Sequence, residues 1–459
     1  MTATGREIPN RKYFRTPATA PGPTGQQLLP HIGAITRNPV EYLMRTWQAY
    51  GDVVQFPVPK PPSYLINDPA AVRRVLVDNG RNYGKSTIQY RSLALVTGEG
   101  LLTADAESWR RQRPLVQPAF HRESLTALAA HIVPIAQRLF ADWERRPGEI
   151  IDVDAAMMET ALDVVGQSLF GTDFATDAKR LTAATLDALD VVIARARPSI
   201  PAPAWLPTRS NRKLHKALNE LDGAVARVLA DRDALGQPAS DMVGMLLAAR
   251  DDHGVGLTAA EVRDQLVTFI VAGHETVASA LTWTWALLAA HPDIQRQLQA
   301  EADAVLAGGA ATIDDYARLP FTRAVFDEAL RLYPPAWLIT RNSLAADELG
   351  GFDVPAGSLI ILSPWLLHRH PAMWDEPDRF NPSRFTEGRF ERTAFIPFGA
   401  GARQCIGKDF AYVESVLLLA MTAGRFTLEF PPGAGMPAAA PLVTVRPISG
   451  LPLRVTTRH

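Results

Sequence analysis

The sequence predicts a mainly α-helical fold with small β-sheets. The chief observation is the apolar segment 259–290, which opens with a Thr258–Glu261 capping box and ends before Pro292. At 1.5 Å per residue, such a helix is roughly 48 Å long and crosses a whole domain. The second observation is a pair of short Val-, Tyr- and Ile-rich runs, separated by prolines, within 52–68. These runs predict two strands near the N-terminus.

The remaining elements follow from caps, prolines and periodicity. Asp152 predicts the start of a helix that ends at Phe170. Another helix begins near Pro320 and stops before Pro334. The amphipathic segment 408–424 predicts a helix directly after Gly407. The alternating segment 441–455, with a turn at Ser449–Gly450, predicts a C-terminal β-hairpin.

No linker clearly divides the chain, so we expect a single domain over residues 31–459. The Pro/Gly-rich residues before it, 1–30, predict an extended N-terminal arm. Segment 197–207 contains four prolines and separates two helical runs. It is equally compatible with a mobile lid and with a rigid connector.

The composition excludes several classes of protein. With a formal net charge of −1 over 459 residues, the chain is not expected to bind nucleic acid or a membrane surface. The single cysteine cannot form an intrachain disulfide or a cysteine-rich metal site. Segment 266–290 is apolar enough for a membrane span, but His274 and Glu275 at its centre favour a buried core helix. We therefore expect a cytoplasmic protein.

The one cysteine, Cys405, lies between Gly401 and Gly407 and just before the helix that follows. A lone cysteine is more often a small buried apolar residue than a ligand. Here, however, the free N–H groups and positive dipole end of a helix would stabilise a thiolate. The glycines let the backbone approach a flat partner. A single thiolate suits one axial position of a metal already held by four other atoms, as in haem.

These residues carry a resemblance. The spacing Phe398-x-x-Gly401-x-Arg403-x-Cys405-x-Gly407 resembles the haem-binding signature of the cytochrome P-450 superfamily, of the soluble bacterial type. The resemblance implies a cytochrome P-450 fold with haem b between the 259–290 helix and the 408–424 helix. It implies that Cys405 is the iron ligand, that Phe398 packs near the sulfur and that Arg403 meets a haem propionate.

The long helix contains a second matching pattern, Ala272-Gly273-His274-Glu275-Thr276. Its small residues lie along one helix face, and Thr276 is placed to hydrogen-bond to the Ala272 carbonyl and loosen the helix. Glu275, in an apolar run, requires a partner or water. The alternative interpretation is a groove for helix packing. The resemblance implies that 272–276 is the family's oxygen-binding pattern, with Ala272 and Gly273 next to the cofactor and with Thr276 and Glu275 delivering protons.

Further stretches agree with the resemblance. Glu328 and Arg331 lie three residues apart on a predicted helix and, with Arg384, resemble the family's structural ion-pair network. Trp109, Arg113 and Arg341 match positions that contact the haem propionates. Any one of these arginines is alternatively a solvated surface residue.

The resemblance implies a monooxygenase that hydroxylates a C–H bond with O₂ and two electrons. A ferredoxin and an NAD(P)H-dependent ferredoxin reductase are the expected electron donors. We expect a monomer acting on a small hydrophobic substrate, such as a terpenoid, a fatty acid or a polyketide-like compound. The alternatives are a peroxide-driven peroxygenase or haem-thiolate isomerase, which tend to lack the acid and threonine found here, and a non-catalytic haem sensor.

Overall fold

A computed structural model describes residues 19–458 except 59–60, 122–124, 127–128, 172–177, 197–205, 236–241 and 389. The chain divides into two compact units. The first, which we call the β-rich unit, comprises residues 1–91, 331–379 and 389–405. The second, the helical unit, comprises residues 92–330, 380–388 and 406–459. The predicted 197–207 connector lies almost entirely outside the described residues, and the predicted domain boundary at residue 31 stays a prediction.

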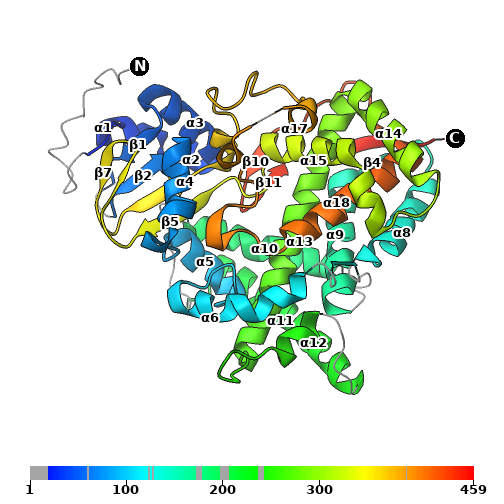
Figure 1. Cartoon of the computed structure of the whole chain (residues 1–459), viewed down its shortest axis with the longest axis horizontal. Helices are drawn as coiled ribbons and strands as arrows, with labels where there is room; N and C mark the ends of the chain where they lie inside the picture. The colour runs from blue at the N-terminus through cyan, green and yellow to red at the C-terminus, as the bar shows by residue number, and fades with distance from the viewer. Residues whose placement is uncertain are drawn as a thin grey trace. The chain divides into compact units, whose positions relative to one another are not determined.

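A five-stranded sheet in the order β1-β2-β8-β5-β3 forms the centre of the β-rich unit (Figure 1). Its pairs are antiparallel except β2 with β8, which is parallel. The pair β1–β2 confirms the strand pair predicted within 52–68. The strands are β1 (Val53–Phe56), β2 (Ser63–Ile66), β3 (Tyr83–Gly84), β5 (Ile339–Ser343) and β8 (Leu359–Leu362), with a separate antiparallel pair of β6 (Asp347–Leu349) and β7 (Phe352–Val354).

The sheet buries its apolar side chains against a short helix and the turn that follows it. Tyr64, Ile66, Ile360 and Leu362 share a core with Val72. The unit's helices are α1 (Gly25–Leu28), α2 (Ile32–Arg37), α3 (Pro39–Tyr50), α4 (Pro69–Arg73) and α16 (Pro364–Leu367).

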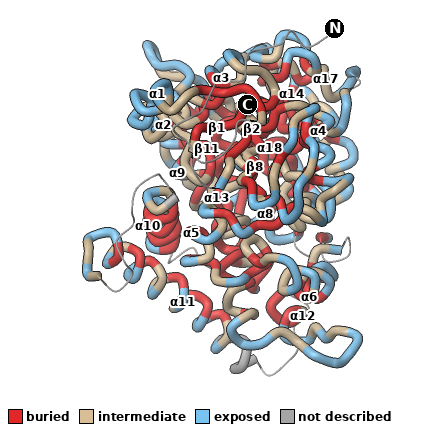
Figure 2. The backbone as a smooth tube through the Cα atoms, turned by 90° about the vertical axis from the view of Figure 1, so that its left-hand side faces the viewer, coloured by how far each residue is buried: buried red, intermediate tan, exposed pale blue. Residues whose placement is uncertain are grey.

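The N-terminal arm is not extended through residue 30, contrary to the expectation from its prolines and glycines. Thr24 and Gln27 form a reciprocal capping box that starts α1. Such a box satisfies two backbone donors at once and outweighs the local glycine content. Figure 2 shows that α1 and α2 are largely exposed.

The helical unit is built around α13, which packs along α9 and also contacts α11, α14 and α18. Its helices are α5 (Ile88–Thr97, of which residues from 92 onward belong here), α6 (Ala106–Val116), α8 (Ile132–Glu144), α9 (Val153–Phe170), α10 (Ala178–Ala196), α11 (Arg209–Leu235), α12 (Met242–Ala248), α13 (Ala259–Ala290), α14 (Pro292–Leu306), α15 (Pro320–Leu332, of which residues to 330 belong here), α17 (Ser383–Thr386) and α18 (Lys408–Arg425).

Four of the predicted helices are confirmed in position and ends. The Thr258–Glu261 capping box opens α13, and Asp152 caps α9 by accepting hydrogen bonds from the Asp154 and Ala155 N–H groups. The helices α15 and α18 begin at Pro320 and Lys408. A mainly helical fold with small sheets is therefore confirmed.

The predicted C-terminal hairpin is wrong. The strands β11 (Val445–Pro447) and β12 (Pro452–Thr457) do not form a ladder with each other. Instead β11 pairs with β10 (Ala439–Pro441). Both edges of β12 are taken by β4 (Ile150–Asp152) and β9 (Phe426–Glu429). Because β12 is the central strand of a three-stranded sheet, it has no edge left for β11.

Among the described residues, α13 is the one helix long and apolar enough to cross a membrane, and 83% of its most apolar window is buried. The chain thus places this segment in its own core, as its central acid and histidine predicted.

A buried acid in α18 makes the stability of the helical unit depend on pH. Glu414 is 1% exposed, and neither of its carboxyl oxygens has a partner among the described residues. Burial holds its pKa well above the ordinary value of 4.5. Since the pKa is higher in the folded state, ionisation opposes folding. Each pH unit above 4.5 costs about 1.4 kcal/mol until the folded-state pKa is reached.

We predict that Glu414→Gln is increasingly more stable than the wild type as the pH rises from 5 to 9, because an amide does not ionise. Chemical denaturation at several pH values measures the difference. The exposed Glu429, on β9, provides the control, since Glu429→Gln makes the same change at a carboxyl that is not buried. A Glu414→Gln variant whose advantage is constant with pH would contradict the prediction.

Candidate active site

The loop that carries Cys405 is a tight turn of the β-rich unit. The Cys405 N–H donates to the Phe398 carbonyl at 3.0 Å, and the Gln404 N–H donates to the Gly401 carbonyl at 3.0 Å. A short 3₁₀ turn covers Gly401–Arg403. Cys405 is exposed to solvent, whereas Phe398 and Arg403 are partly buried. The loop therefore fixes its backbone internally and leaves the thiol accessible.

Gly401 is required by the shape of this loop. Its φ is +70°, and a Cβ atom built there would lie 2.0 Å from the Leu76 carbonyl oxygen. No other residue type fits both the left-handed backbone and this close approach. The close approach at Gly401 is to the Leu76 backbone, and the expected approach to a flat partner stays a prediction.

The helix that follows the loop, α18, is held at its first turns within the helical unit. Gly407 is its N-cap residue and Lys408 its first residue. One turn along, the Tyr412 hydroxyl donates to Asp327 on α15 at 2.5 Å. The Arg323 guanidinium lies over the Tyr412 ring, 5.2 Å from its centre. Burial raises the pKa of Asp327 to about 6, against the opposing effect of Tyr412 and Arg323.

The face of α13 that carries the predicted oxygen-binding pattern is accessible. From Gln265 to Ala289, every residue is buried except Ala272, Gly273 and Thr276. The Thr276 hydroxyl donates to the Ala272 carbonyl at 2.5 Å, as predicted. A Cβ at position 273 would come 2.9 Å from Val165 Cγ2 on α9. Small residues thus let α9 approach, while Thr276 stays partly exposed.

Glu275 lies on a different face and is 2% exposed. Burial raises its pKa to about 7, in spite of the Arg446 charge and the Thr444 hydroxyl, which favour the carboxylate. The charges of Asp154 and Asp190 add to the increase. Its neighbour His274 is fully buried, and burial followed by the Arg446 charge lowers its pKa to about 3. Near neutral pH, Glu275 is therefore able to take up or release a proton, whereas His274 stays neutral.

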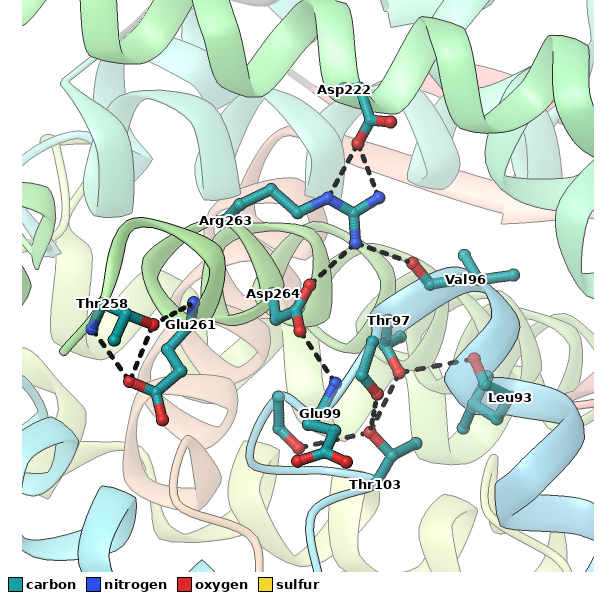
Figure 3. Close-up of polar contacts among 12 residues, drawn as sticks. Leu93, Val96, Thr97, Glu99, Thr103, Asp222, Thr258, Glu261, Arg263 and Asp264 are labelled. Carbon is teal, nitrogen blue, oxygen red and sulfur yellow. Dashed lines mark hydrogen bonds and ion pairs between the residues drawn. The ribbon is translucent and has the colours of Figure 1, made fainter. Parts of the chain in front are cut away.

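The first turns of α13 are tied to two neighbouring segments, as Figure 3 shows. Arg263 donates to Asp222 on α11 at 2.8 and 2.5 Å and to the Val96 carbonyl at 3.4 Å. The Asp264 carboxylate accepts from the Glu99 N–H at 2.8 Å. These contacts fix the start of α13 and so the position of its accessible face.

The predicted structural network is present in two parts. Arg384 approaches Glu328, with Nε 3.4 Å from Oε1, and the Asn381 N–H donates to the same oxygen at 2.9 Å. Arg331 is fully buried and donates to three carbonyl oxygens, those of His368, Pro377 and Arg379, at 2.8, 2.6 and 3.1 Å. Arg331 thus holds the 368–379 segment of the β-rich unit in place.

The residues predicted to contact the propionates lie on α6, on β5 and, for Arg403, in the loop that carries Cys405. Trp109 and Arg113 are one turn apart on α6 and partly buried. Arg341, on β5, is 6% exposed and donates to the Tyr90 hydroxyl at 3.3 Å and the Thr340 carbonyl at 2.8 Å. Their roles toward haem stay predictions, as do those of Arg403, Phe398 and Gly407.

Sequence reasoning missed one ionic group beside the site. Arg446 on β11 pairs with Asp154 on α9 at 2.6 Å, and both are buried. Strand alternation turns Arg446 away from its apolar neighbour Val445, so the pattern indicates a solvated side chain. Only the three-dimensional packing of β11 against α9 and α13 reveals the pair.

The comparisons with known proteins agree with this geometry. Residues 21–451 match the sequence profile of the family described as Cytochrome P450. The chain is 37% identical to "Cyclooctatin synthase" from Streptomyces melanosporofaciens over 455 residues, which cover 97% of each chain. It is 36% identical to "Cyclooctat-9-en-7-ol 5-monooxygenase" of the same organism, over 91% of each chain. It is 34% identical to "Pentalenene oxygenase" from Streptomyces avermitilis, over 96% of this chain and 97% of the relative.

The fold and the thiol-bearing loop define a haem-thiolate class of oxygenase. The chain belongs to the cytochrome P450 family and is a cytochrome P450 monooxygenase. The family implies a haem-iron cofactor, and the residues present fit it. Cys405 supplies an exposed thiol on a glycine-shaped loop, and α13 leaves an accessible stripe of small residues.

We predict that Gly401→Ala abolishes haem incorporation and sharply lowers stability, because the added methyl collides with the Leu76 carbonyl. Gly433→Ala is the matched control, since Gly433 has a φ of +81° and open space around its Cβ position. The left-handed backbone alone costs about 1–2 kcal/mol. Denaturant unfolding and the haem absorbance of the purified proteins measure both effects. Equal losses in the two variants would show that the close approach is unimportant.

Proposed function

We propose that this chain hydroxylates a small cyclic terpenoid at haem b, using O₂ and electrons from a separate ferredoxin and ferredoxin reductase. We further propose that it acts as a cytoplasmic monomer. The observation that carries the proposal is the partly exposed stripe Ala272, Gly273 and Thr276, in a stretch from Gln265 to Ala289 that is otherwise buried. Such a stripe is suited to a planar cofactor and a small ligand, since it stays partly exposed although α9 approaches Gly273.

When bound, a haem iron with a thiolate ligand supplies the activation of O₂ and the oxidation of the C–H bond. Cys405 would hold the iron, and Gly401 and Gly407 would let the loop lie close to the ring. Phe398 would pack beside the sulfur. Charge-assisted hydrogen bonds from Arg113, Arg341 and Arg403, with the Trp109 N–H, would hold the two propionates.

Thr276 and Glu275 would supply protons to the bound group from α13. The Thr276 hydroxyl is accessible and bonded to a helix carbonyl, so it can orient a water or a bound ligand. Glu275 has a pKa of about 7, which suits a group that exchanges protons at neutral pH. The presence of both residues favours a monooxygenase over the peroxygenase, isomerase and sensor alternatives.

The named relatives support the substrate class. Two of them are named for pentalenene and for cyclooctat-9-en-7-ol, which are cyclic terpenoids. They match this chain over nearly its whole length, including the segments around the accessible stripe. A terpenoid is therefore favoured over a fatty acid or a polyketide-like compound.

Optical titration of the purified ferric protein tests this proposal directly. Cyclic terpenes and terpene alcohols are expected to shift the Soret band towards high spin, whereas fatty acids and macrolides are not. A shift produced only by fatty acids or macrolides would refute the substrate class. A purified protein without a haem band, after expression with haem precursor, would refute the role of Cys405.

We predict that Thr276→Ala uncouples the reaction: NAD(P)H consumption persists, product falls about tenfold and peroxide rises. The matched control is Thr284→Ala. Thr284 donates to the Ala280 carbonyl at 2.7 Å in the same way, but it is fully buried. Product and peroxide are measured per NAD(P)H consumed. Equal uncoupling in both variants would assign the effect to helix distortion rather than to a hydroxyl at the site.

In the sequence, Arg110, Arg111, Arg122 and Lys408 are candidates for a basic patch that binds the ferredoxin. Arg111 is engaged by an ion pair with Glu261, and Arg122 lies outside the described residues. Arg110 is exposed on α6, so it is the better candidate. Arg110→Glu is expected to slow reduction by ferredoxin at low salt and to have little effect at high salt. Stopped-flow reduction measures this, and a salt-independent rate would exclude Arg110 from the dock.

A further inference from the structure

One face of α13, next to the accessible stripe, is bonded to α9 and to the strand β11. Glu275, Ser279 and Thr282 lie along it, at successive turns of the helix. The Ser279 hydroxyl donates to the Val445 carbonyl at 2.6 Å, and the Thr282 hydroxyl donates to Asp154 at 3.1 Å. These two bonds bring β11 and the start of α9 to the face that carries Glu275.

Arg446, the residue after Val445, is the buried cation of this region. Its exposure is 8%, and its Nη2 pairs with Asp154 Oδ2 at 2.6 Å. Its Nη1 lies 2.8 Å from Met158 Sδ, and its Nε has no partner among the described residues. The guanidinium is therefore only partly satisfied by Asp154. A buried cation with unused donors is stabilised by a second anion.

One buried guanidinium lies near two buried carboxyls. Asp154 pairs with it directly, and Glu275 lies on the face of α13 that Ser279 and Thr282 tie to β11 and α9. The groups that face Glu275 are Arg446 from β11, Asp154 from α9, Asp190 from α10, and His274 and the Thr444 hydroxyl. Since His274 is neutral, Arg446 is the one cation among these described groups that favours ionised Glu275.

We propose that Arg446, held by Asp154 beside this face of α13, is a positioning residue that sets the charge of the Glu275 carboxyl for proton supply to the accessible face of the helix. The proposal rests on the proposed role of Glu275 in proton supply. It assigns Arg446 no contact with substrate or haem. It adds to the catalytic apparatus a strand and a helix, β11 and α9, that the sequence patterns had not linked to it.

The proposal predicts that substitutions of Arg446 and of Asp154 shift the pH of half protonation of Glu275 in opposite directions. Arg446→Met removes the cation that favours ionised Glu275, so the pH at which Glu275 is half protonated rises. Asp154→Asn removes an anion that competes for the same cation, so this pH falls. Each shift is expected to reach about one pH unit, a tenfold change in the proton-binding constant. A general disturbance of packing would not move the two variants in opposite directions.

The experiment is infrared titration of the resting holoenzyme, which follows the protonated-carboxyl absorption against pH without turnover. Asp327 and Glu414 are buried acids with raised pKa values and contribute to the same region. The Glu275 band is therefore defined as the component that is missing in Glu275→Gln. Arg446→Lys, which keeps the charge, is expected to titrate like the wild type. Arg454→Met, at an exposed arginine of β12, is expected to do the same.

The pH dependence of coupling, measured as product per NAD(P)H, is expected to move with the infrared midpoint in each variant. Unchanged midpoints in Arg446→Met and Asp154→Asn, or shifts of both in the same direction, would overturn the proposal. If Arg446→Met does not fold, the downward shift in Asp154→Asn and the unchanged midpoint in Arg446→Lys still decide it. If the midpoints shift as expected while Glu275→Gln leaves coupling intact, Arg446 controls the charge of Glu275, and the proton-supply role of Glu275 is the part that fails.

Discussion

The burial of α13 is the constraint on which the helical unit depends. A helix of 32 residues that is covered on nearly all sides must satisfy its own backbone and find partners for every polar side chain. Ser279 and the Trp283 indole both donate to one acceptor, the Val445 carbonyl, at 2.6 and 2.8 Å. Gln265 accepts from the Leu101 N–H at 3.1 Å. The polar residues of α13 therefore determine where β11 and the 97–103 loop lie.

The helical repeat separates two chemical tasks on adjacent residues. Successive residues of an α-helix point about 100° apart. Thr276 consequently lies in the partly exposed stripe, while Glu275 is buried on the face that Ser279 and Thr282 tie to β11 and α9. The Thr276 hydroxyl and the Glu275 carboxyl, whose pKa is raised by burial, thus lie on different faces of α13 although they are adjacent in sequence.

Much of this could be predicted from the sequence where the signal was local. Helix ends were predicted correctly because their signals act on neighbouring residues. The Asp152 cap marks the start of α9, and the Thr258 capping box and Pro292 mark the two ends of α13. Pro320 marks the start of α15. The spacing of Cys405 with Gly401 and Arg403 identified the family for the same reason. The hydrogen bonds from the Cys405 and Gln404 N–H groups join residues within a few positions of one another, whereas the approach of Gly401 to the distant Leu76 carbonyl could not be predicted.

What could not be predicted depended on distant partners. The strands β10, β11 and β12 were mistaken for one hairpin, because nothing in 441–455 reveals that β4 and β9 occupy both edges of β12. In the five-stranded sheet, β8 pairs with β2 and β5 pairs with β3, and each of these pairs joins strands that are more than 250 residues apart in the chain. Arg446 and Asp154 were missed because each looks ordinary in its own segment, an arginine in a strand and an acid in a first helical turn.

The pairing of Asp154 with Arg446 spans 292 positions of the chain. The segments that carry Asp154 and Glu275 are therefore translated well before Arg446. Until β11 is added, these two buried carboxyls lack the cation that lies beside them in the folded protein. The final burial of α13 against α9 is thus coupled to a strand that is synthesised later.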